Sequence, residues 1–371
     1  MTATLDRAPA ATAPRIVSVG TAVPPEHYSQ EELLDLFGIT DRRVRSVFLL
    51  GSIRQRSLVL PPAAPDGTRL RENQGDLLDK HKAWAVSMGS DAMSLCLKRI
   101  GADLSEVGYL CCVTSTGFLT PGLSALMIRE LGMDWHTARA DIVGMGCNAG
   151  LNALAVVGNW AAAHPGRLAV MVCSEACSAA YTMDSTMRTA VVNSLFGDGA
   201  AAVAVMADPG PGDGDGEEGP VRRLEGPGIL KTASVTIVDA IDAMRYDWDR
   251  DQDRFSFFLD PQIPYLVGAH VEGVIDLLLD GTSLRRDDVA HWLVHSGGKK
   301  VIDAVAVNLG LTRHDLRHTI TVLRDFGNVS SGSFLFSYDR LLQEGVVRAG
   351  DYGVLMTMGP GSTIESALIQ W

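Results

Sequence analysis

The sequence predicts an α/β fold built around mixed β-sheets, and three observations support this prediction. Short apolar runs typical of buried strands alternate with longer segments of helical periodicity along the chain. Glycine is abundant, at 38 of 371 residues, which suits a fold with many tight turns between strands and helices. A segment rich in glycine, proline and acidic residues at 209–220 divides the alternation into two parts. Such alternation is typical of layered α/β proteins.

The first half of the chain runs from residue 15 to residue 208. It follows a tail at 1–14 that lacks any apolar pattern, so we expect this tail to be disordered. Ser29 and Glu32 have the spacing of a capping box and predict the start of an early helix, while Gly132 predicts the end of a later one. The main elements predicted here are strands at Arg15–Val23, Val107–Thr114, Arg167–Ser174 and Ala200–Met206 and a helix at Gly122–Leu131.

The segment at 209–220, PGPGDGDGEEGP, is too rich in glycine, proline and acid to pack, and we expect an exposed loop there. The second half, 221–371, repeats the alternation and ends in a predicted hairpin. Its main predicted elements are strands at Leu230–Val238 and Ala290–His295, helices at Ile263–Leu279 and Lys299–Leu309, and hairpin strands at Tyr352–Met358 and Ser362–Ile369.

Composition narrows the classes of partner and site. The formal net charge of −12 argues against nucleic acid or an anionic membrane surface as the main partner. No apolar run reaches the roughly 18 residues of a membrane-spanning helix, and the N-terminal residues lack the apolar core of a secretory signal. The six cysteines form neither a CxxC pair nor a regular framework. We therefore expect no metal site, no disulfide scaffold and a cytoplasmic protein.

Cys147 is the most informative candidate residue. It follows a predicted strand that ends at Ile142 and Val143, and it precedes a long apolar helix. Free backbone N–H groups and the positive end of the helix dipole favour thiolate over thiol at such a position. Gly146 and Gly150 let a substrate carbonyl approach the backbone. We predict that Cys147 is a nucleophile for acyl groups; the alternative is an inert, buried cysteine.

Two later residues complete a matching set. His295 ends a predicted strand just before a glycine turn, and Asn328 lies in a Gly/Ser turn ahead of another predicted helix. A histidine can accept the thiol proton and hold thiolate as an ion pair, and His and Asn donors can stabilise an enolate. His291 points to the same face of the strand as His295, but it lacks the glycine turn and is the weaker candidate.

Five ordered segments resemble the signatures of the type III polyketide synthases, the chalcone synthase-like branch of the thiolase superfamily. They are GCNAG around Cys147, LFGDGAAA at Leu195–Ala202, WLVHSGG around His295, GNVSSG around Asn328 and MGPGSTIE at Met358–Glu365. The resemblance runs from about Arg15 to Trp371. It implies a thiolase-like αβαβα layered fold from two similar halves, a homodimer, and CoA thioester substrates with no further cofactor.

The resemblance also assigns roles to the three candidate residues. Cys147 would accept an acyl group from CoA as a thioester, with His295 as its base and ion-pair partner. His295 and Asn328 would bind the malonyl thioester carbonyl, favour loss of carbon dioxide and hold the resulting enolate. The activity implied is iterative decarboxylative Claisen condensation of malonyl-CoA units.

Further residues match family positions around the substrate. Two aromatic residues, Tyr181 and Phe257, match cavity gatekeepers, and Arg54 and Arg56 match a segment that contacts CoA phosphates. Thr120 is expected to reach across the dimer interface. The remaining expected cavity residues are Ser115, Gly359, Pro360 and Gly361.

Within the family, the segment Arg71–Ala83 and the short region after Tyr181 differ from plant enzymes. The chain resembles the bacterial subfamily that makes 3,5-dihydroxyphenylacetyl-CoA for glycopeptide antibiotics. That resemblance implies four malonyl-CoA units, self-priming and an accessory pathway protein. Open alternatives are an alkylresorcinol- or tetrahydroxynaphthalene-forming polyketide synthase, an initiating β-ketoacyl carrier-protein synthase, and a catalytically silent thiolase-fold subunit.

Overall fold

The computed structural model describes residues 13–65, 69, 72–181, 186–209 and 225–371. The predicted tail lies outside these residues except for its last two positions, and the predicted loop at 209–220 lies outside them except for Pro209.

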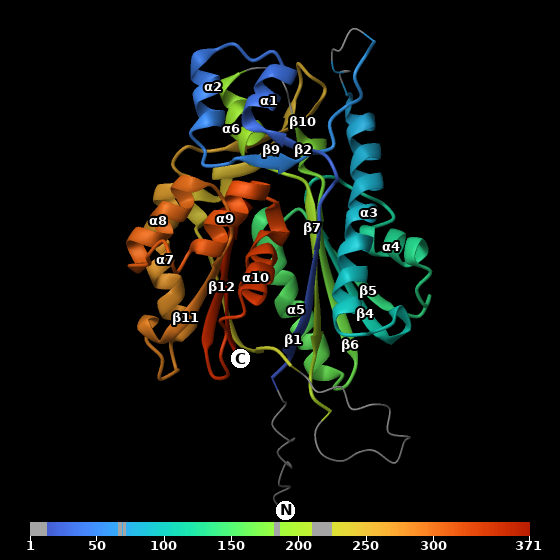
Figure 1. The fold of residues 1–371 in the computed structure, drawn as a ribbon, viewed down its shortest axis with the longest axis vertical. Coiled ribbons are helices and arrows are strands. Elements are labelled where there is room, and N and C mark those ends of the chain that lie inside the picture. The colour runs from blue at the N-terminus through green and yellow to red at the C-terminus, as the bar shows by residue number, and fades with distance from the viewer. Residues whose placement is uncertain (1–12, 66–68, 70–71, 182–185, 210–224) are drawn as a thin grey trace, which may run out of the picture.

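The described residues form a mixed α/β structure (Figure 1). The strands are β1 (Arg15–Ala22), β2 (His27–Ser29), β3 (Gln55–Ser57), β4 (Val107–Thr114), β5 (Ala138–Val143), β6 (Leu168–Glu175), β7 (Gly199–Met206), β8 (Gly228–Thr236), β9 (Met244–Asp249), β10 (Arg254–Leu259), β11 (Val289–Val294), β12 (Tyr352–Gly359) and β13 (Thr363–Gln370). The α-helices are α1 (Gln30–Leu36), α2 (Arg42–Leu49), α3 (Gln74–Arg99), α4 (Leu123–Leu131), α5 (Ala149–Ala163), α6 (Met187–Leu195), α7 (Ile263–Leu279), α8 (Lys299–Leu309), α9 (Arg317–Phe326) and α10 (Ser333–Glu344).

Nine strands form one sheet in the order β11-β12-β13-β8-β1-β7-β6-β4-β5. Strands from each half of the chain are neighbours in this order, and the two groups meet where β1 pairs with β8 through Arg15 and Gly228. The predicted terminal hairpin is present, because β12 and β13 pair antiparallel from Tyr352–Gln370 to Gly359–Thr363.

The helices form three layers around these strands (Figure 1). Helices α3 and α4 pack on the first-half strands, α7 packs on β8 and β13 with α8 beside it, and α5 and α10 lie between the two groups of strands. This is the αβαβα arrangement that the resemblance implied. The central layer is apolar because its helices bury residues on several sides, among them Leu154, Val157, Phe334 and Leu335.

Local sequence signals account for several element ends. Ser29 and Glu32 form both hydrogen bonds of a capping box at the start of α1. Gly132 ends α4 with φ of 64°, a left-handed conformation that favours glycine. Helices α7 and α8 have the bounds that their periodicity predicts. Most predicted strands differ from the observed ones by one or two residues.

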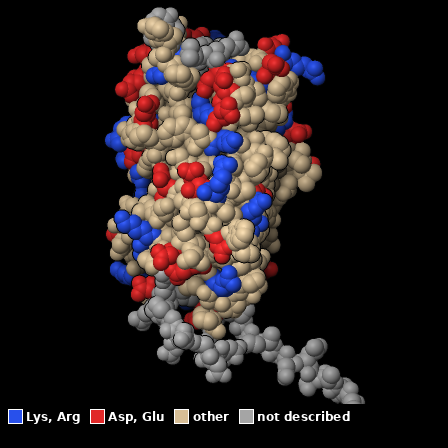
Figure 2. All heavy atoms as spheres, turned by 90° about the vertical axis from the view of Figure 1, so that its right-hand side faces the viewer, with Lys and Arg blue, Asp and Glu red and all other residues tan. Residues whose placement is uncertain are grey.

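A smaller group of elements covers one end of the layers. Helices α1, α2 and α6 and the hairpin of β9 and β10 lie at the top of Figure 1, above the central helices. The face that carries α3 and α4 shows acidic and basic side chains scattered among uncharged areas (Figure 2). No helix in the described part of the chain is long and apolar enough to cross a membrane.

Candidate active site

Cys147 lies where β5 gives way to the central helix α5. The chain passes Gly144 and Gly146, both with positive φ (82° and 71°), and then a short 3₁₀ turn that contains Cys147. A Cβ atom on Gly146 would come within 2.4 Å of the Pro360 ring. Glycine is therefore required there by both backbone conformation and space.

The Cys147 thiol is buried at the centre of a polar cluster. Its Sγ lies 3.5 Å from Ser330 Oγ and also hydrogen-bonds the Asn328 side chain. Burial raises the pKa of the Cys147 thiol to about 12. The expectation that the helix N-terminus lowers this pKa is therefore wrong, because loss of hydration outweighs the hydrogen bonds to the thiol. The thiolate needs a further partner.

His295 follows β11 directly and is 1% exposed. Its Nδ1 hydrogen-bonds the Ser333 hydroxyl at the start of α10, which leaves Nε2 available to a substrate. The ring packs on Gly297, where a Cβ atom would approach within 3.0 Å. Burial lowers the pKa of His295 to about 3, so the imidazole is neutral and able to accept a proton.

Asn328 follows Gly327, which ends α9 with φ of 70°. The Asn328 Oδ1 accepts a hydrogen bond of 2.8 Å from the Ser330 backbone N–H. This contact orients the amide, so that its NH₂ group can serve as a donor to a ligand.

The two central helices bring these groups together. Helix α5 begins after Cys147, and α10 begins after the turn that carries Ser330. The helices meet at their first turns, since a Cβ atom on Gly150 would lie 2.2 Å from the Ser331 carbonyl oxygen. Nucleophile and amide, which are far apart in the sequence, therefore converge at the N-terminal ends of both helices.

Two cavities adjoin at the thiol. The outer cavity has a volume of about 580 Å³, and His295 and Asn328 lie in its wall. The inner cavity has a volume of about 340 Å³ and is mostly apolar. Both cavities are lined by Cys147, Phe196, Met244 and Phe257. The rings of Phe196 and Phe257 pack edge to face with centroids 5.9 Å apart, so they narrow the junction beside the thiol.

Glu175, which ends β6 behind the inner cavity, was not predicted from the sequence. Its buried carboxylate accepts hydrogen bonds from Ser331 Oγ at 2.6 Å, the Ser115 N–H at 2.9 Å and Thr116 Oγ1 at 3.1 Å. Burial raises the pKa of this carboxyl above its ordinary value. The available signal was an acidic residue in an otherwise apolar strand, because a buried carboxylate requires donors.

The structure corrects the assignment of Tyr181 as a gatekeeper. Tyr181 is buried outside both cavity walls, and its hydroxyl donates to the Phe196 carbonyl oxygen and accepts from Arg56. Phe196 lies at the junction instead and, like Phe257, lines both cavities. The Tyr181 hydroxyl accepts a hydrogen bond from Arg56 because a buried guanidinium requires acceptors.

The other predicted cavity residues divide into two groups. Ser115 and Pro360 line the inner cavity, and a Cβ atom on Gly359 would lie 3.0 Å from the Cys147 amide nitrogen. Gly361 has φ of 74° in the turn after Pro360. Thr120 is exposed and lies outside both cavity walls of the protomer.

The two predicted CoA-binding arginines differ in their surroundings. Arg56 is fully buried and donates to Tyr181, to the Phe196 carbonyl and to Gln30, so it cannot reach an external phosphate. Arg54 is exposed but lies 3.1 Å from Asp325 and is not in the outer cavity wall.

The cations in that wall are Lys299 and Lys300, at the start of α8. Lys299 pairs with Asp303 at 2.5 Å, and Lys300 is exposed. Their only sequence signal was a lysine pair after a glycine turn.

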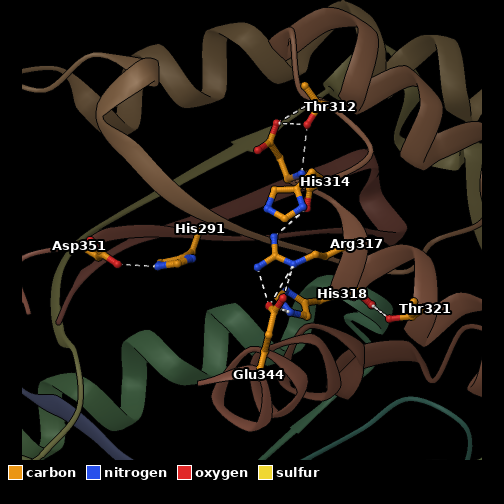
Figure 3. Close-up of polar contacts among 9 residues, drawn as sticks. His291, Thr312, His314, Arg317, His318, Thr321, Glu344 and Asp351 are labelled. Carbon is orange, nitrogen blue, oxygen red and sulfur yellow. Dashed lines mark hydrogen bonds and ion pairs between the residues drawn. The ribbon is translucent and has the colours of Figure 1, made fainter. Parts of the chain in front are cut away.

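The competing histidine His291 lies away from the site. Its Nε2 is 2.9 Å from Asp351 (Figure 3). Its ring also packs edge to face on Trp371. A second group nearby joins His318 and Arg317 to Glu344. These pairs connect elements of the second half and do not line either cavity.

The described residues contain no group of three or more His, Cys, Asp or Glu residues that could hold a metal ion. All six cysteines are free and buried. Cys111, Cys112 and Cys173 pack in the sheet, and Cys177 lines the inner cavity.

Comparison with known proteins agrees with this geometry. The chain is 70% identical to a 3,5-dihydroxyphenylacetyl-CoA synthase of Streptomyces toyocaensis over 358 residues, which cover 96% of this chain and 90% of that protein. It is 69% identical to a protein of the same description from Amycolatopsis balhimycina, covering 96% and 93%.

Solved structures with lower sequence identity to this chain have the same fold. The 1,3,6,8-tetrahydroxynaphthalene synthase of Streptomyces coelicolor superimposes with a TM-score of 0.84 at 26% identity, covering 96% of this chain and 99% of that one. Residues 72–209 match the N-terminal domain of the chalcone and stilbene synthases, and residues 233–371 match their C-terminal domain. The chain therefore belongs to the chalcone and stilbene synthase family, the type III polyketide synthases.

Proposed function

We propose that this protein condenses four malonyl-CoA units and closes the product into 3,5-dihydroxyphenylacetyl-CoA. The observation that carries the proposal is the 70% identity, over 96% of the chain, to a 3,5-dihydroxyphenylacetyl-CoA synthase. The intact set of Cys147, His295 and Asn328 on adjoining cavity walls supports it.

In the loading step, Cys147 attacks the thioester carbonyl of the first CoA substrate. His295 accepts the thiol proton, since its neutral imidazole has Nε2 available and faces the same cavity. Burial disfavours either charge alone, so the thiolate and imidazolium form together as a pair. The proton then leaves with the departing CoA thiolate, and the acyl group remains on Cys147.

In the extension step, a second malonyl-CoA enters the outer cavity. In the tautomer that carries its proton on Nε2, where Nδ1 accepts from the Ser333 hydroxyl, His295 donates a hydrogen bond to the thioester carbonyl oxygen, and the Asn328 amide donates a second one. Loss of carbon dioxide leaves an enolate, whose negative oxygen these donors stabilise. The enolate carbon attacks the Cys147 thioester, and the chain grows by two carbons.

The growing chain moves into the inner cavity between rounds. Phe196 and Phe257 lie at the junction and limit what can pass the thiol. The inner cavity is lined mainly by apolar groups, among them Pro360, and its volume of about 340 Å³ favours a short, folded polyketide.

The outer cavity provides a place for the CoA arm. Lys299 and Lys300 at its rim can bind phosphates as point charges. The apolar side chains of Leu50 and Ile53 on another part of the wall can contact the pantetheine arm.

We also propose a homodimer. Strand β5 is at one end of the sheet order, and nearby exposed apolar residues include Phe118 (73% exposed), Trp135 (86%) and Val143 (44%). Exposed Thr120 lies in the same loop as Phe118 and would contact the second copy. Phe118→Asp should convert the dimer to monomer in light scattering, while Tyr265→Asp on α7 should not.

The proposed chemistry requires no metal or redox group, since every step uses a thiol, an imidazole or an amide of the chain. Activity should therefore survive exhaustive dialysis against EDTA. We place the protein in the cytoplasm, where its six free thiols would stay reduced. An accessory protein of the same pathway would speed product formation.

The decisive test is mass spectrometry of the products that purified protein makes from malonyl-CoA alone. We expect a dihydroxyphenylacetyl thioester that is absent with Cys147→Ala. A product formed only after addition of a long-chain acyl-CoA would favour an alkylresorcinol synthase. A requirement for carrier protein, with a linear product, would favour the initiating β-ketoacyl synthase.

A further inference from the structure

The inner cavity contains one hydroxyl group that makes no hydrogen bond to the described part of the protein: that of Tyr246 on β9. Tyr246 forms part of the cavity wall and keeps 40% of its surface accessible, so a ligand in the cavity can reach it. Its ring is fixed by a tilted contact with Phe257 at 5.0 Å and an edge contact with Phe255 at 6.3 Å between centroids.

The other polar side chains of that wall have protein partners. The Ser115 hydroxyl accepts from the Gly146 N–H at 2.8 Å, and the Thr116 and Ser330 hydroxyls contact Glu175 at 3.1 and 3.4 Å.

Arg245, next to Tyr246 in the chain, is also engaged. Its Nε lies 2.9 Å from Asp247 Oδ1, and its guanidinium stacks on Phe258 at 4.3 Å. Among the described residues of the cavity wall, the Tyr246 phenol is therefore the hydroxyl that remains available to donate a hydrogen bond to a polyketide.

The phenol lies within the electrostatic influence of the reacting groups. Burial raises the pKa of Tyr246 far above its ordinary value, and the nearby Cys177, Glu175 and Cys147 add to this. The group therefore stays protonated near neutral pH and acts as a donor. Tyr246 belongs to the β9–β10 hairpin, whereas Cys147 and Ser330 lie in the turns that precede the central helices. The phenol and the thiol therefore reach the cavity from different elements.

Ring closure of the proposed tetraketide needs such a donor. Four malonyl-CoA molecules yield one 3,5-dihydroxyphenylacetyl-CoA, three CoA, four carbon dioxide and one water. The water derives from a ketone oxygen of the chain, which must be protonated as the ring closes and must leave when it aromatises. Decarboxylation does not supply this step.

Resting on the proposed function, we infer that Tyr246 is the acid for ring closure: its phenol hydrogen-bonds the ketone oxygen under attack and protonates it. The attacking carbon of the chain reacts as its enol and forms the new C–C bond with its π electrons, while the C=O π pair moves to the ketone oxygen, which takes the Tyr246 proton. The enol oxygen becomes a ketone again and releases its O–H proton, which restores the phenol. Loss of the new hydroxyl with a neighbouring C–H proton gives water and the ring double bond, and enolisation of the two remaining ketones gives the two phenols.

The test is the ratio of ring-closed product to CoA released, measured with Tyr246→Phe and malonyl-CoA. This variant keeps the ring contacts and removes only the hydroxyl. We expect the ratio to fall at least tenfold, with the lost aromatic product replaced by lactones from uncyclised chains. Tyr265→Phe is the matched control, because Tyr265 is an exposed tyrosine of α7 outside both cavities, and its ratio should equal that of the wild type.

Each other outcome is informative. An unchanged ratio in Tyr246→Phe would overturn the role of Tyr246 while leaving the proposed function intact. Loss of CoA release in parallel with product, in a variant with wild-type thermal stability, would also overturn it, since the hydroxyl would then act in condensation. If the wild-type protein makes no dihydroxyphenyl product from malonyl-CoA, the proposed function is wrong, and the inference about Tyr246 is wrong as well.

Discussion

Cys147 and His295 are both buried, and burial moves their pKa values in opposite directions, to about 12 and about 3. Each group is therefore neutral when considered alone. Transfer of the thiol proton to the imidazole creates two charges that stabilise one another, whereas loss of that proton to water would leave a single buried charge. Reactivity of the thiol should thus depend on His295.

His295→Gln tests this dependence. At pH 7, iodoacetamide should inactivate the variant at least about tenfold more slowly than the wild type, because the thiol has lost its base. Since the thiol pKa is raised, the thiolate fraction of the variant should grow about tenfold per pH unit between pH 7 and 10. His291→Gln is the control and should behave as wild type. Equal rates for wild type and His295→Gln would exclude the proposed role of His295.

The cations around the outer cavity allow a second test at the residue scale. Lys300→Glu should raise KM for malonyl-CoA by roughly tenfold, the effect of losing one charge-assisted contact, with little change in stability. Lys82→Glu on the exposed face of α3 should leave KM unchanged. If the KM of the Lys300→Glu variant for malonyl-CoA equals that of the wild type, CoA binds along another part of the wall.

Arg56 gives the opposite expectation. Its guanidinium supports the backbone that carries Phe196, and it packs against Gly327 just before Asn328. Arg56→Gln should lower the free energy of unfolding by about 1–3 kcal/mol, because it leaves buried acceptors unpaired. Urea titration measures this. Unchanged stability with a raised KM would restore Arg56 as a CoA ligand.

At the scale of elements, the site depends on the contact between the first turns of α5 and α10. Glycine at position 150 permits this contact, since no side chain fits between the helix and the Ser331 carbonyl. The arrangement places the amide of one half beside the thiol of the other. Neither helix alone forms the site.

Gly150→Ala should therefore weaken both stability and activity. Its Cβ atom would lie 2.2 Å from the Ser331 oxygen, and relieving that overlap should cost about 1–3 kcal/mol. Gly158→Ala in the same helix is the matched control: its nearest neighbour would be 3.5 Å away. Alanine there should be neutral or stabilising by up to about 1 kcal/mol. Urea unfolding of both variants measures the difference in their free energies of unfolding. Equal stabilities of the two variants would contradict the tight contact between α5 and α10.

At the scale of the whole molecule, two groups of strands meet through one residue pair of the sheet but share the central helices. Helices α5 and α10 contact strands of both halves, and their side chains form one continuous apolar core. Neither half can expose these helices without losing much of its own buried surface. The two halves should behave as one cooperative unit.

Thermal unfolding checks this cooperativity. We expect one transition, in which peptides of the first and second halves lose hydrogen-exchange protection together as denaturant increases. Earlier exchange of the second half alone would show that its strands and outer helices are stable without the central layer.

The sequence by itself determined much of the fold and the identity of the reacting groups. Helical periodicity predicted α7 and α8 at their observed bounds, because amphipathic spacing follows from local geometry. Cys147, His295 and Asn328 were marked by glycine turns at element ends and by the family resemblance.

The tertiary structure decided what surrounds those groups. Only the packing of distant elements showed that Arg56 and Tyr181 are buried partners, that Phe196 narrows the junction, that Tyr246 lines the inner cavity, and that Glu175 contacts residues of its wall. The direction of the Cys147 pKa shift likewise depends on burial by residues far away in the chain. The spacing of residues in the sequence determines local conformation. The hydration of a side chain and the contacts between separate segments are determined only when the layers pack together.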